Sequence, residues 1–288
     1  MNYIAPTLAD AYIDLLEDLV SSSPMPGYKS TDAEVLGATV VLTEPRYNLI
    51  QSYGRKFNYR YMVAEMMWNA QPTDKIAPLK WVMPSVENYV QDQPEGTHEW
   101  ATWAYGESVF PGLVSCYELL KEDLDTRRAV IRVAEPYSHY GTPPCLVSIQ
   151  FIHRDGKLHA FTQMRSNDAW RGFPLDVYQF SMWQIFLAAA LGVEVGHYNH
   201  SIGSLHLYTR DREEAEKYIS AEFNSVRSST PDKSAFNDIV ECRWGLAMST
   251  HSTTLVEGSL PWVGTYLNLN EQMCPEFLSL KSAGCGRW

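Results

Sequence analysis

Residues 145–166 read CLVSIQFIHRDGKLHAFTQMRS, and this stretch decides how the centre of the chain folds. Two runs rich in β-branched and aromatic residues flank RDGK at 154–157, and Asp-Gly between two such runs is a strong signal of a β-hairpin. An almost wholly apolar run comes next at about 174–192, which predicts a buried central helix. The stretch therefore predicts a sheet with a helix packed against it.

The segments on either side alternate between helical and extended patterns, without internal repeats or low-complexity stretches. This alternation predicts one α+β domain with a single core over residues 1–288. Residues 72–111 are predicted to be loop-rich, and about 231–288 form a divergent C-terminal segment that matches no motif. Helices are predicted at about 7–20, 58–70, 112–123 and 211–223, and strands at about 34–43, 126–136 and 201–209.

Composition narrows the class of protein. The formal net charge of −11 argues against nucleic acid as a partner, since neutralising phosphates needs clustered Lys and Arg. The five cysteines are scattered and contain no CxxC pair, which favours a reducing compartment and argues against a bound metal. The longest apolar run, 180–193, is too short to span a bilayer. We therefore expect a cytoplasmic protein with no membrane partner.

Three short clusters carry side chains suited to chemistry: PPC at 143–145, RSND at 165–168 and GSLHLY at 203–208. Each has an ordinary structural explanation taken alone. A lone cysteine in a strand is usually a small buried hydrophobe, and Arg, Ser and Asp at a strand-to-helix junction usually cap the helix or form surface ion pairs.

The joint order of these clusters resembles the thymidylate synthase family. Two further motifs agree with it: DTRR at 125–128 resembles the family's paired arginines, and EMMW at 65–68 lies where the family carries a catalytic glutamate. The resemblance covers about residues 30–215. It implies the thymidylate synthase-like fold, with a large mixed or antiparallel sheet, packed helices including a buried central one, and a dimer formed through the sheet.

The resemblance also implies roles for the residues that act on the base. Cys145 corresponds to the nucleophile that adds to C6 of a pyrimidine, and Arg165 beside it is expected to lower the pKa of the thiol. Glu65 corresponds to the acid that organises water and proton transfers. Asp168 corresponds to a contact of the pterin of the cofactor, 5,10-methylenetetrahydrofolate.

Phosphate and sugar ligands are implied by the same resemblance. Arg165 and Ser166 correspond to phosphate ligands of the same subunit, and Arg127 and Arg128 to ligands lent across a homodimer interface, where guanidinium groups bind phosphate oxygens bidentately. The pair that holds the sugar hydroxyl corresponds to His206 and Tyr208.

Asp176 marks a departure from the synthases, which carry an asparagine that pairs with uracil at this position. A carboxylate accepts from the N4 amino group of cytosine, and from N3 once N3 is protonated, so Asp176 favours cytosine. Asp176 also belongs among the catalytic candidates. Residues 164–168 and 203–206 are closely similar to the deoxycytidylate (dCMP) hydroxymethylases of phages, and Leu146 and Met164 replace a histidine and a glutamine of the synthases.

These likenesses imply a hydroxymethyltransferase that converts dCMP, 5,10-methylenetetrahydrofolate and water to 5-hydroxymethyl-dCMP and tetrahydrofolate, in the host cytoplasm if the gene belongs to a phage. A dCMP C5-methyltransferase that uses hydride instead of water, a CMP hydroxymethylase of nucleoside-antibiotic synthesis, and an inactive nucleotide-binding homologue are the alternatives. Tyr105 or His98 could remove the C5 proton. Lys29 is a weak substitute for a missing phosphate-loop arginine, and Trp81 is a candidate to shield the reacting carbon.

Overall fold

The computed structural model describes residues 1–22, 31–50, 54–70, 76–89, 104–133 and 143–224. They lie in one compact unit, Met1–Arg227, and the divergent segment at about 231–288 lies outside them. The elements in chain order are β1 (Asn2–Ala5), α1 (Leu8–Ser21), β2 (Thr31–Leu42), α2 (Tyr59–Asn69), α3 (Ala77–Val82), the 3-10 helix η2 (Pro84–Tyr89), α4 (Gly106–Glu122), β3 (Val130–Arg132), β4 (Leu146–Arg154), β5 (Lys157–Asp168), α5 (Gly172–Leu191), β6 (Glu194–Tyr208) and α6 (Thr209–Asn224).

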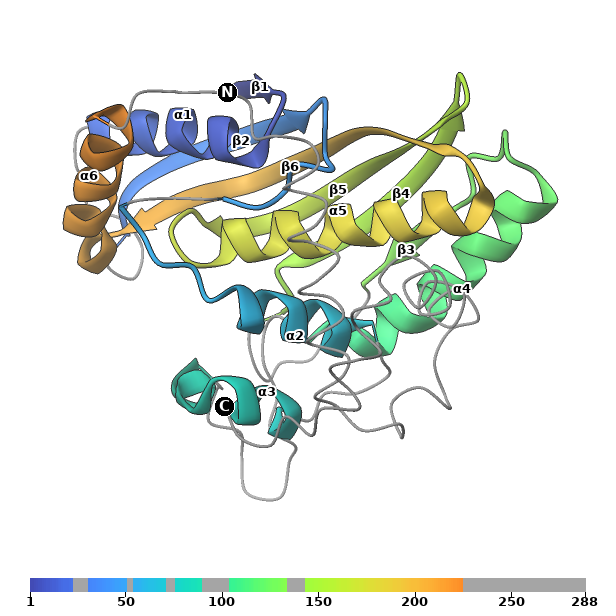
Figure 1. The fold of residues 1–288 in the computed structure, drawn as a ribbon, viewed down its shortest axis with the longest axis horizontal. Helices are drawn as coiled ribbons and strands as arrows, with labels where there is room; N and C mark the ends of the chain where they lie inside the picture. Colours follow the sequence, from blue (N-terminus) through green and yellow to red (C-terminus); the bar gives the residue numbers. More distant parts are fainter. Residues whose placement is uncertain (23–30, 51–53, 71–75, 90–103, 134–142, 225–288) are drawn as a thin grey trace, which may run out of the picture. The chain divides into compact units, whose positions relative to one another are not determined.

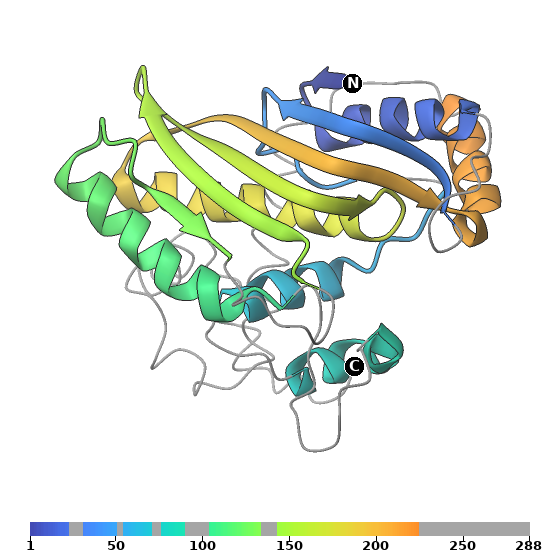
Figure 2. The same cartoon turned by 180° about the vertical axis from the view of Figure 1, so that it is seen from behind.

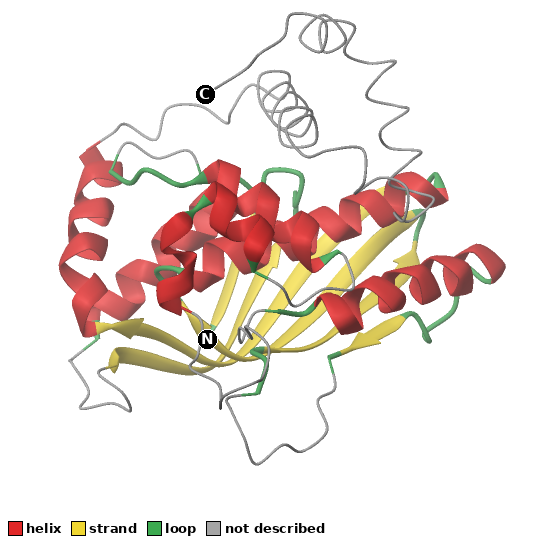
Figure 3. Ribbon diagram, turned by 90° about the horizontal axis from the view of Figure 1, so that it is seen from below, coloured by secondary structure: helices red, strands yellow, loops and turns green. Residues whose placement is uncertain are grey.

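Six strands form one mixed sheet in the order β1-β2-β6-β5-β4-β3 (Figures 1 and 2). The pairs β1–β2 and β5–β6 are parallel, and the other three pairs are antiparallel. Viewed along the sheet, the helices gather on one side of it (Figure 3). The predicted α+β class and the large mixed sheet are therefore confirmed.

Two neighbouring rows of side chains across the sheet show that its faces differ. One row is buried in every strand and consists of Tyr3, Val40, His200, Thr162, Ile149 and Ile131. The adjacent row, which alternation places on the opposite face, is partly or fully exposed in every strand and consists of Ile4, Val41, Asn199, Phe161, Gln150 and Val130. The core thus lies between the sheet and the helices, and the second face is open in the described part of the chain.

The hairpin and the central helix form as the sequence predicts. Asp155 and Gly156 both have positive φ, 53° and 77°, as a two-residue turn of the right twist requires. Of the 20 residues of α5, 14 are buried, and the helix ends at Gly192, which adopts the left-handed conformation of a C-cap. This helix supplies the wall against which the candidate site is built.

Most of the remaining predicted helices and strands are confirmed, with corrections to their bounds. The region expected to be loop-rich contains α3 and η2 and the start of α4, while β3 is shorter than the predicted strand. The four-residue β1 was missed because so short a strand gains its hydrogen bonds only by pairing with β2. Within the described residues, no helix is both long and apolar enough to cross a membrane.

Candidate active site

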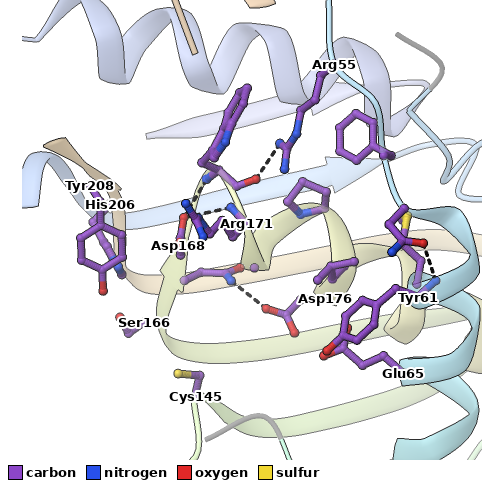
Figure 4. A pocket seen from close by; sticks show the side chains of 18 of the residues that line it. Arg55, Tyr61, Glu65, Cys145, Ser166, Asp168, Arg171, Asp176, His206 and Tyr208 are labelled. Carbon is purple, nitrogen blue, oxygen red and sulfur yellow. Dashed lines mark hydrogen bonds between the residues drawn. The ribbon is translucent and has the colours of Figure 1, made fainter. Parts of the chain in front are cut away.

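A cavity of about 700 Å³ lies where the ends of β5 and β6 meet the first turns of α5 and the helix α2 (Figure 4). Its volume falls within the range of small-molecule sites, about 300–1,000 Å³. Of the ten site residues proposed from the sequence, eight line it: Glu65, Cys145, Arg165, Ser166, Asp168, Asp176, His206 and Tyr208. The structure therefore brings together motifs that lie far apart in the chain.

Strand register explains this convergence. In the β4–β5 hairpin, the backbone N–H of Arg165 donates to the carbonyl of Cys145 over 2.9 Å. In the parallel β5–β6 pair, Asp168 lies beside His206. A Cβ atom on Gly203 would lie 2.7 Å from the carbonyl oxygen of Arg165, so the close approach of these two strands requires glycine at this position.

The Cys145 thiol differs from the expectation in its acidity. Burial raises its pKa to about 11, although the neighbouring Arg165 acts to lower it. The predicted effect of the arginine has the right sign but is outweighed by desolvation. The guanidinium of Arg165 donates through Nε to the carbonyl of Pro144 over 2.9 Å and through Nη2 to the carbonyl of Pro143, so it also orients the segment that leads to the cysteine.

Asp176, in the first turns of α5, presents a buried carboxylate to the cavity. Its Oδ2 accepts from Nδ2 of Asn167 over 2.8 Å, and its Oδ1 accepts from Nε2 of Gln179 over 3.0 Å. Burial raises the pKa of the carboxyl to about 7, while the two amide donors act to lower it. Both oxygens therefore already serve as acceptors within the protein.

Glu65 lies on α2, whose N-terminus is capped by Asn58. The side chain is buried, and its Oε2 has no hydrogen-bond partner among the described residues. Burial, and secondarily the charge of Asp176, raises the pKa of this carboxyl well above its usual range, against the effect of a hydrogen bond with Tyr61. Such a carboxyl holds a proton more readily than an exposed one, and it can exchange that proton with a ligand or water.

Tyr105 also lines the cavity and is fully buried. Burial raises the pKa of its hydroxyl, and the negative charges of Asp176, Cys145 and Glu65 raise it further. The hydroxyl therefore lies close enough to these three side chains to interact with their charges. Of the two residues considered for removal of the C5 proton, Tyr105 is therefore in the cavity, and His98 lies outside the described residues.

The nucleotide-binding candidates form a polar wall. The rings of His206 and Tyr208 meet edge to face with centroids 4.9 Å apart. Oδ1 of Asp168 accepts from the backbone N–H groups of Trp170 and Arg171 over 2.8 and 3.0 Å, and this fixes the chain where it enters α5. The carboxyl of Asp168 is buried, which raises its pKa.

Several cationic residues of the cavity wall were not predicted from the sequence. These are Arg55, Lys56, Arg171 and Arg210. The Arg55 guanidinium lies 3.9 Å from the centroid of the Trp170 ring, and Arg171 forms an ion pair with Asp211 over 2.8 Å. A signal for the first two was present, because Arg-Lys closely precedes the helix that carries Glu65.

Arg127 and Arg128 are the two proposed site residues that do not line this cavity. Both side chains are exposed near the start of β3, and Nε of Arg128 donates to Oγ1 of Thr126 over 3.3 Å. Lys29 lies outside the described residues, as does the side chain of Trp81.

Comparison with known families agrees with this geometry. The family model described as thymidylate synthase matches residues 11–240, which is most of the chain. Members of that family are one-carbon transferases that act on pyrimidine nucleotides, and methylenetetrahydrofolate is their general one-carbon donor. The match, the mixed sheet and the cysteine-centred cavity lead to one conclusion: the chain belongs to the thymidylate synthase family.

Proposed function

We propose that the protein is a deoxycytidylate 5-hydroxymethyltransferase, which converts dCMP, 5,10-methylenetetrahydrofolate and water to 5-hydroxymethyl-dCMP and tetrahydrofolate. The observation that carries the choice of base is the Asp176 carboxylate, whose two oxygens both accept hydrogen bonds from buried amides. Cytosine offers donors to such a group, from N4 and from protonated N3. Uracil would instead turn its O4 acceptor toward an acceptor, at a cost of about 1–3 kcal/mol.

Cys145 acts as the nucleophile in this proposal. Its Sγ, once deprotonated, forms a bond with C6 of cytosine. The electrons of the C5–C6 double bond shift to C4–C5, those of the N3–C4 double bond shift to N3, and N3 takes up one proton, which balances the proton that the thiol gives up. Because burial holds the pKa of the thiol at about 11, deprotonation has to accompany nucleotide binding, and the positive charge of Arg165 stabilises the thiolate.

The remaining proton transfers involve Tyr105 and Glu65. We propose that Tyr105 relays the C5 proton: its hydroxyl oxygen accepts that proton while its own O–H proton passes to water. The hydroxyl lies close enough to Cys145 and Asp176 to interact with their charges. Glu65 then holds the water that adds to the exocyclic carbon of the nucleotide, because its Oε2 is buried and has no partner among the described residues.

The residues of the cavity fit a reduced folate. Met83, Trp170 and Leu175 supply apolar surface for a flat ring system, and the buried carboxylate of Asp168 suits the N–H donors of a pterin. When bound, the folate supplies a one-carbon unit at the oxidation level of formaldehyde. The likeness of residues 164–168 and 203–206 to dCMP hydroxymethylases supports water rather than hydride in the last step.

We further propose that the enzyme is a homodimer formed through the open face of the sheet. Apolar side chains lie on that face at Ile4 and Phe161, which are 71% and 41% exposed. Arg127 and Arg128 are exposed and away from the cavity of their own subunit, as expected of ligands that bind phosphate in the partner's site.

Mixed dimers test whether these arginines bind phosphate in the site of the partner subunit. Cys145→Ala and the double variant Arg127→Ala/Arg128→Ala are each expected to be nearly inactive. After unfolding and joint refolding they should recover about a quarter of the parental activity, since half of randomly paired dimers carry one intact site. No recovery, from proteins that do form mixed dimers, would show that the arginines serve their own subunit.

The reaction itself is tested by the mass of the product. The protein is incubated with 5,10-methylenetetrahydrofolate and dCMP, dUMP or CMP, and each nucleotide is weighed. A hydroxymethyl group on dCMP is the expected result. A methyl group would replace the last step with hydride transfer, a product from CMP alone would move the substrate to ribonucleotides, and failure to exchange C5 tritium from dCMP would indicate an inactive homologue.

A further inference from the structure

Asp176 is the meeting point of a buried chain of hydrogen bonds that joins α2, α5, β5 and β6. On one side, the backbone N–H of Tyr105 donates to Oδ1 of Asn69 over 2.8 Å, and Nδ2 of Asn69 donates to Oε1 of Gln179 over 3.0 Å. Nε2 of Gln179 then donates to Asp176. A backbone N–H can only donate, so the direction of every hydrogen bond in this arm is fixed. Gln179 must therefore donate its N–H to residue 176.

The other arm runs through the neighbouring strands. Asn167 donates through Nδ2 to Asp176, so its Oδ1 faces Nε2 of His200 at 2.9 Å. The imidazole is neutral, because burial lowers its pKa to about 3. A neutral ring carries one proton, and that proton lies on Nε2, because Nε2 faces the acceptor Oδ1 of Asn167. Its Nδ1 is left to accept from the hydroxyl of Tyr198 over 2.8 Å. Asp176, 7% exposed, is the most exposed member of this network.

We propose that Gln179 and Asn167 are positioning residues that hold residue 176 as a double acceptor, so that the preference for cytosine belongs to the network and not to Asp176 alone. This inference rests on the proposed function, since it explains how dCMP is chosen over dUMP. Neither residue needs to touch the nucleotide. They act by presenting one N–H to each carboxylate oxygen.

The network predicts which hydrogen-bonding groups an amide side chain at position 176 would face. In Asp176→Asn, the new amide oxygen has to accept from Gln179, because that arm cannot reverse. The new amide nitrogen then points at the N–H of Asn167, and two donors oppose each other. Relief requires Asn167 to rotate, His200 to change its tautomer and the hydroxyl of Tyr198 to become an acceptor, all inside the core.

An exchange of the two side chains removes this conflict. In Asn167→Asp/Asp176→Asn, the amide at 176 accepts from Gln179 and donates to the carboxylate at 167, which also accepts from Nε2–H of His200. All partners are then satisfied without rotation or a change of tautomer. The exchanged variant should use dUMP with a kcat/KM about tenfold or more above that of Asp176→Asn, the cost of two opposed buried donors.

A second measurement follows the charge of Asp176. Gln179→Met removes one donor to the carboxylate, so the pKa of Asp176 rises and the acidic limb of the dCMP kcat/KM profile moves to higher pH. Gln184→Met is the matched control. Gln184 is also a buried glutamine of α5, but its Nε2 donates to the carbonyls of Leu158 and Gly196 over 2.8 and 3.0 Å. This control should leave the acidic limb in place.

These experiments distinguish a failure of the proposed function from a failure of the proposed role of the network. If the parent forms no product from dCMP or prefers dUMP, the proposed function is wrong. If the parent prefers dCMP but Asp176→Asn uses dUMP as well as the exchanged variant does, or if Gln179→Met and Gln184→Met have the same pH profile, the function stands and the network is not what selects the base. If a variant loses turnover, the dissociation constants of dCMP and dUMP, measured without folate, allow the parent and the variants to be compared in the same way.

Discussion

The acidity of the Cys145 thiol can be tested directly by alkylation of the nucleotide-free protein. Because the pKa is about 11, the thiolate fraction at pH 7 is on the order of 10⁻⁴, and forming the thiolate costs about 5 kcal/mol. The rate of reaction with iodoacetamide should therefore rise about tenfold per pH unit from pH 7 to 10, without a plateau, because the thiolate is the reactive species.

A second test compares the alkylation of Cys145 with and without the Arg165 side chain. It acts to lower the pKa of the Cys145 thiol, so Arg165→Gln should raise that pKa and slow alkylation at every pH below it. Background from the other cysteines is measured in Cys145→Ser. Cys116 adds little, since burial raises the pKa of its thiol to about 12.

The result that would refute this reasoning is a rate for Cys145 that levels off below pH 9. The thiolate would then exist before the nucleotide binds, and desolvation would not be the dominant influence on the thiol. Repeating the titration with dCMP bound tests the coupling of deprotonation to binding. The nucleotide should protect the sulfur if C6 and Sγ meet in the complex.

Three further substitutions test the described contacts. Glu65→Gln, which keeps the shape but cannot transfer a proton, should lower kcat about 10²–10⁴-fold with little change in the dCMP dissociation constant, as measured by single-turnover kinetics and calorimetry. Phe161→Glu places a charge on the open sheet face and should give a monomer in sedimentation, with weaker phosphate binding; a dimer of unchanged affinity would contradict the proposed interface. Gly203→Ala pushes β6 from the carbonyl of Arg165 and should lower the free energy of unfolding in urea by about 1–3 kcal/mol, whereas an unchanged midpoint would mean that the strands separate freely.

Features with strong local signals could be predicted from the sequence. The Asp-Gly turn and the apolar run of α5 depend on residues close together in the chain, and both were predicted correctly. The adjacency of Asp168 and His206 depends on a parallel pairing of strands separated by a helix. No local pattern encodes that pairing, so only the order of the family's motifs indicated that these residues share a site.

What the sequence could not provide is the degree of burial and the choice of partners. The pKa of Cys145 was expected to fall, because the cation was visible in the sequence and the desolvation was not. Gln179 and Gln184 are two polar residues in the same apolar helix, and nothing in their spacing tells which of them meets Asp176 and which meets backbone carbonyls. Arg55 lies close to the Glu65 helix in the sequence, but its position over Trp170 is a tertiary contact that this proximity does not show.

The parallel pair β5–β6 has a consequence for the thermodynamics of nucleotide binding. The residues proposed to bind the nucleotide, from Arg165 to Asp168 and from Ser204 to Tyr208, lie on two adjacent, hydrogen-bonded strands and not on loops. Their backbone is ordered before the nucleotide arrives, so association does not lose the conformational entropy of folding a loop around it. In the proposed reaction, the interaction energy that a mobile site would use to order its loops therefore remains available to orient the base at Cys145.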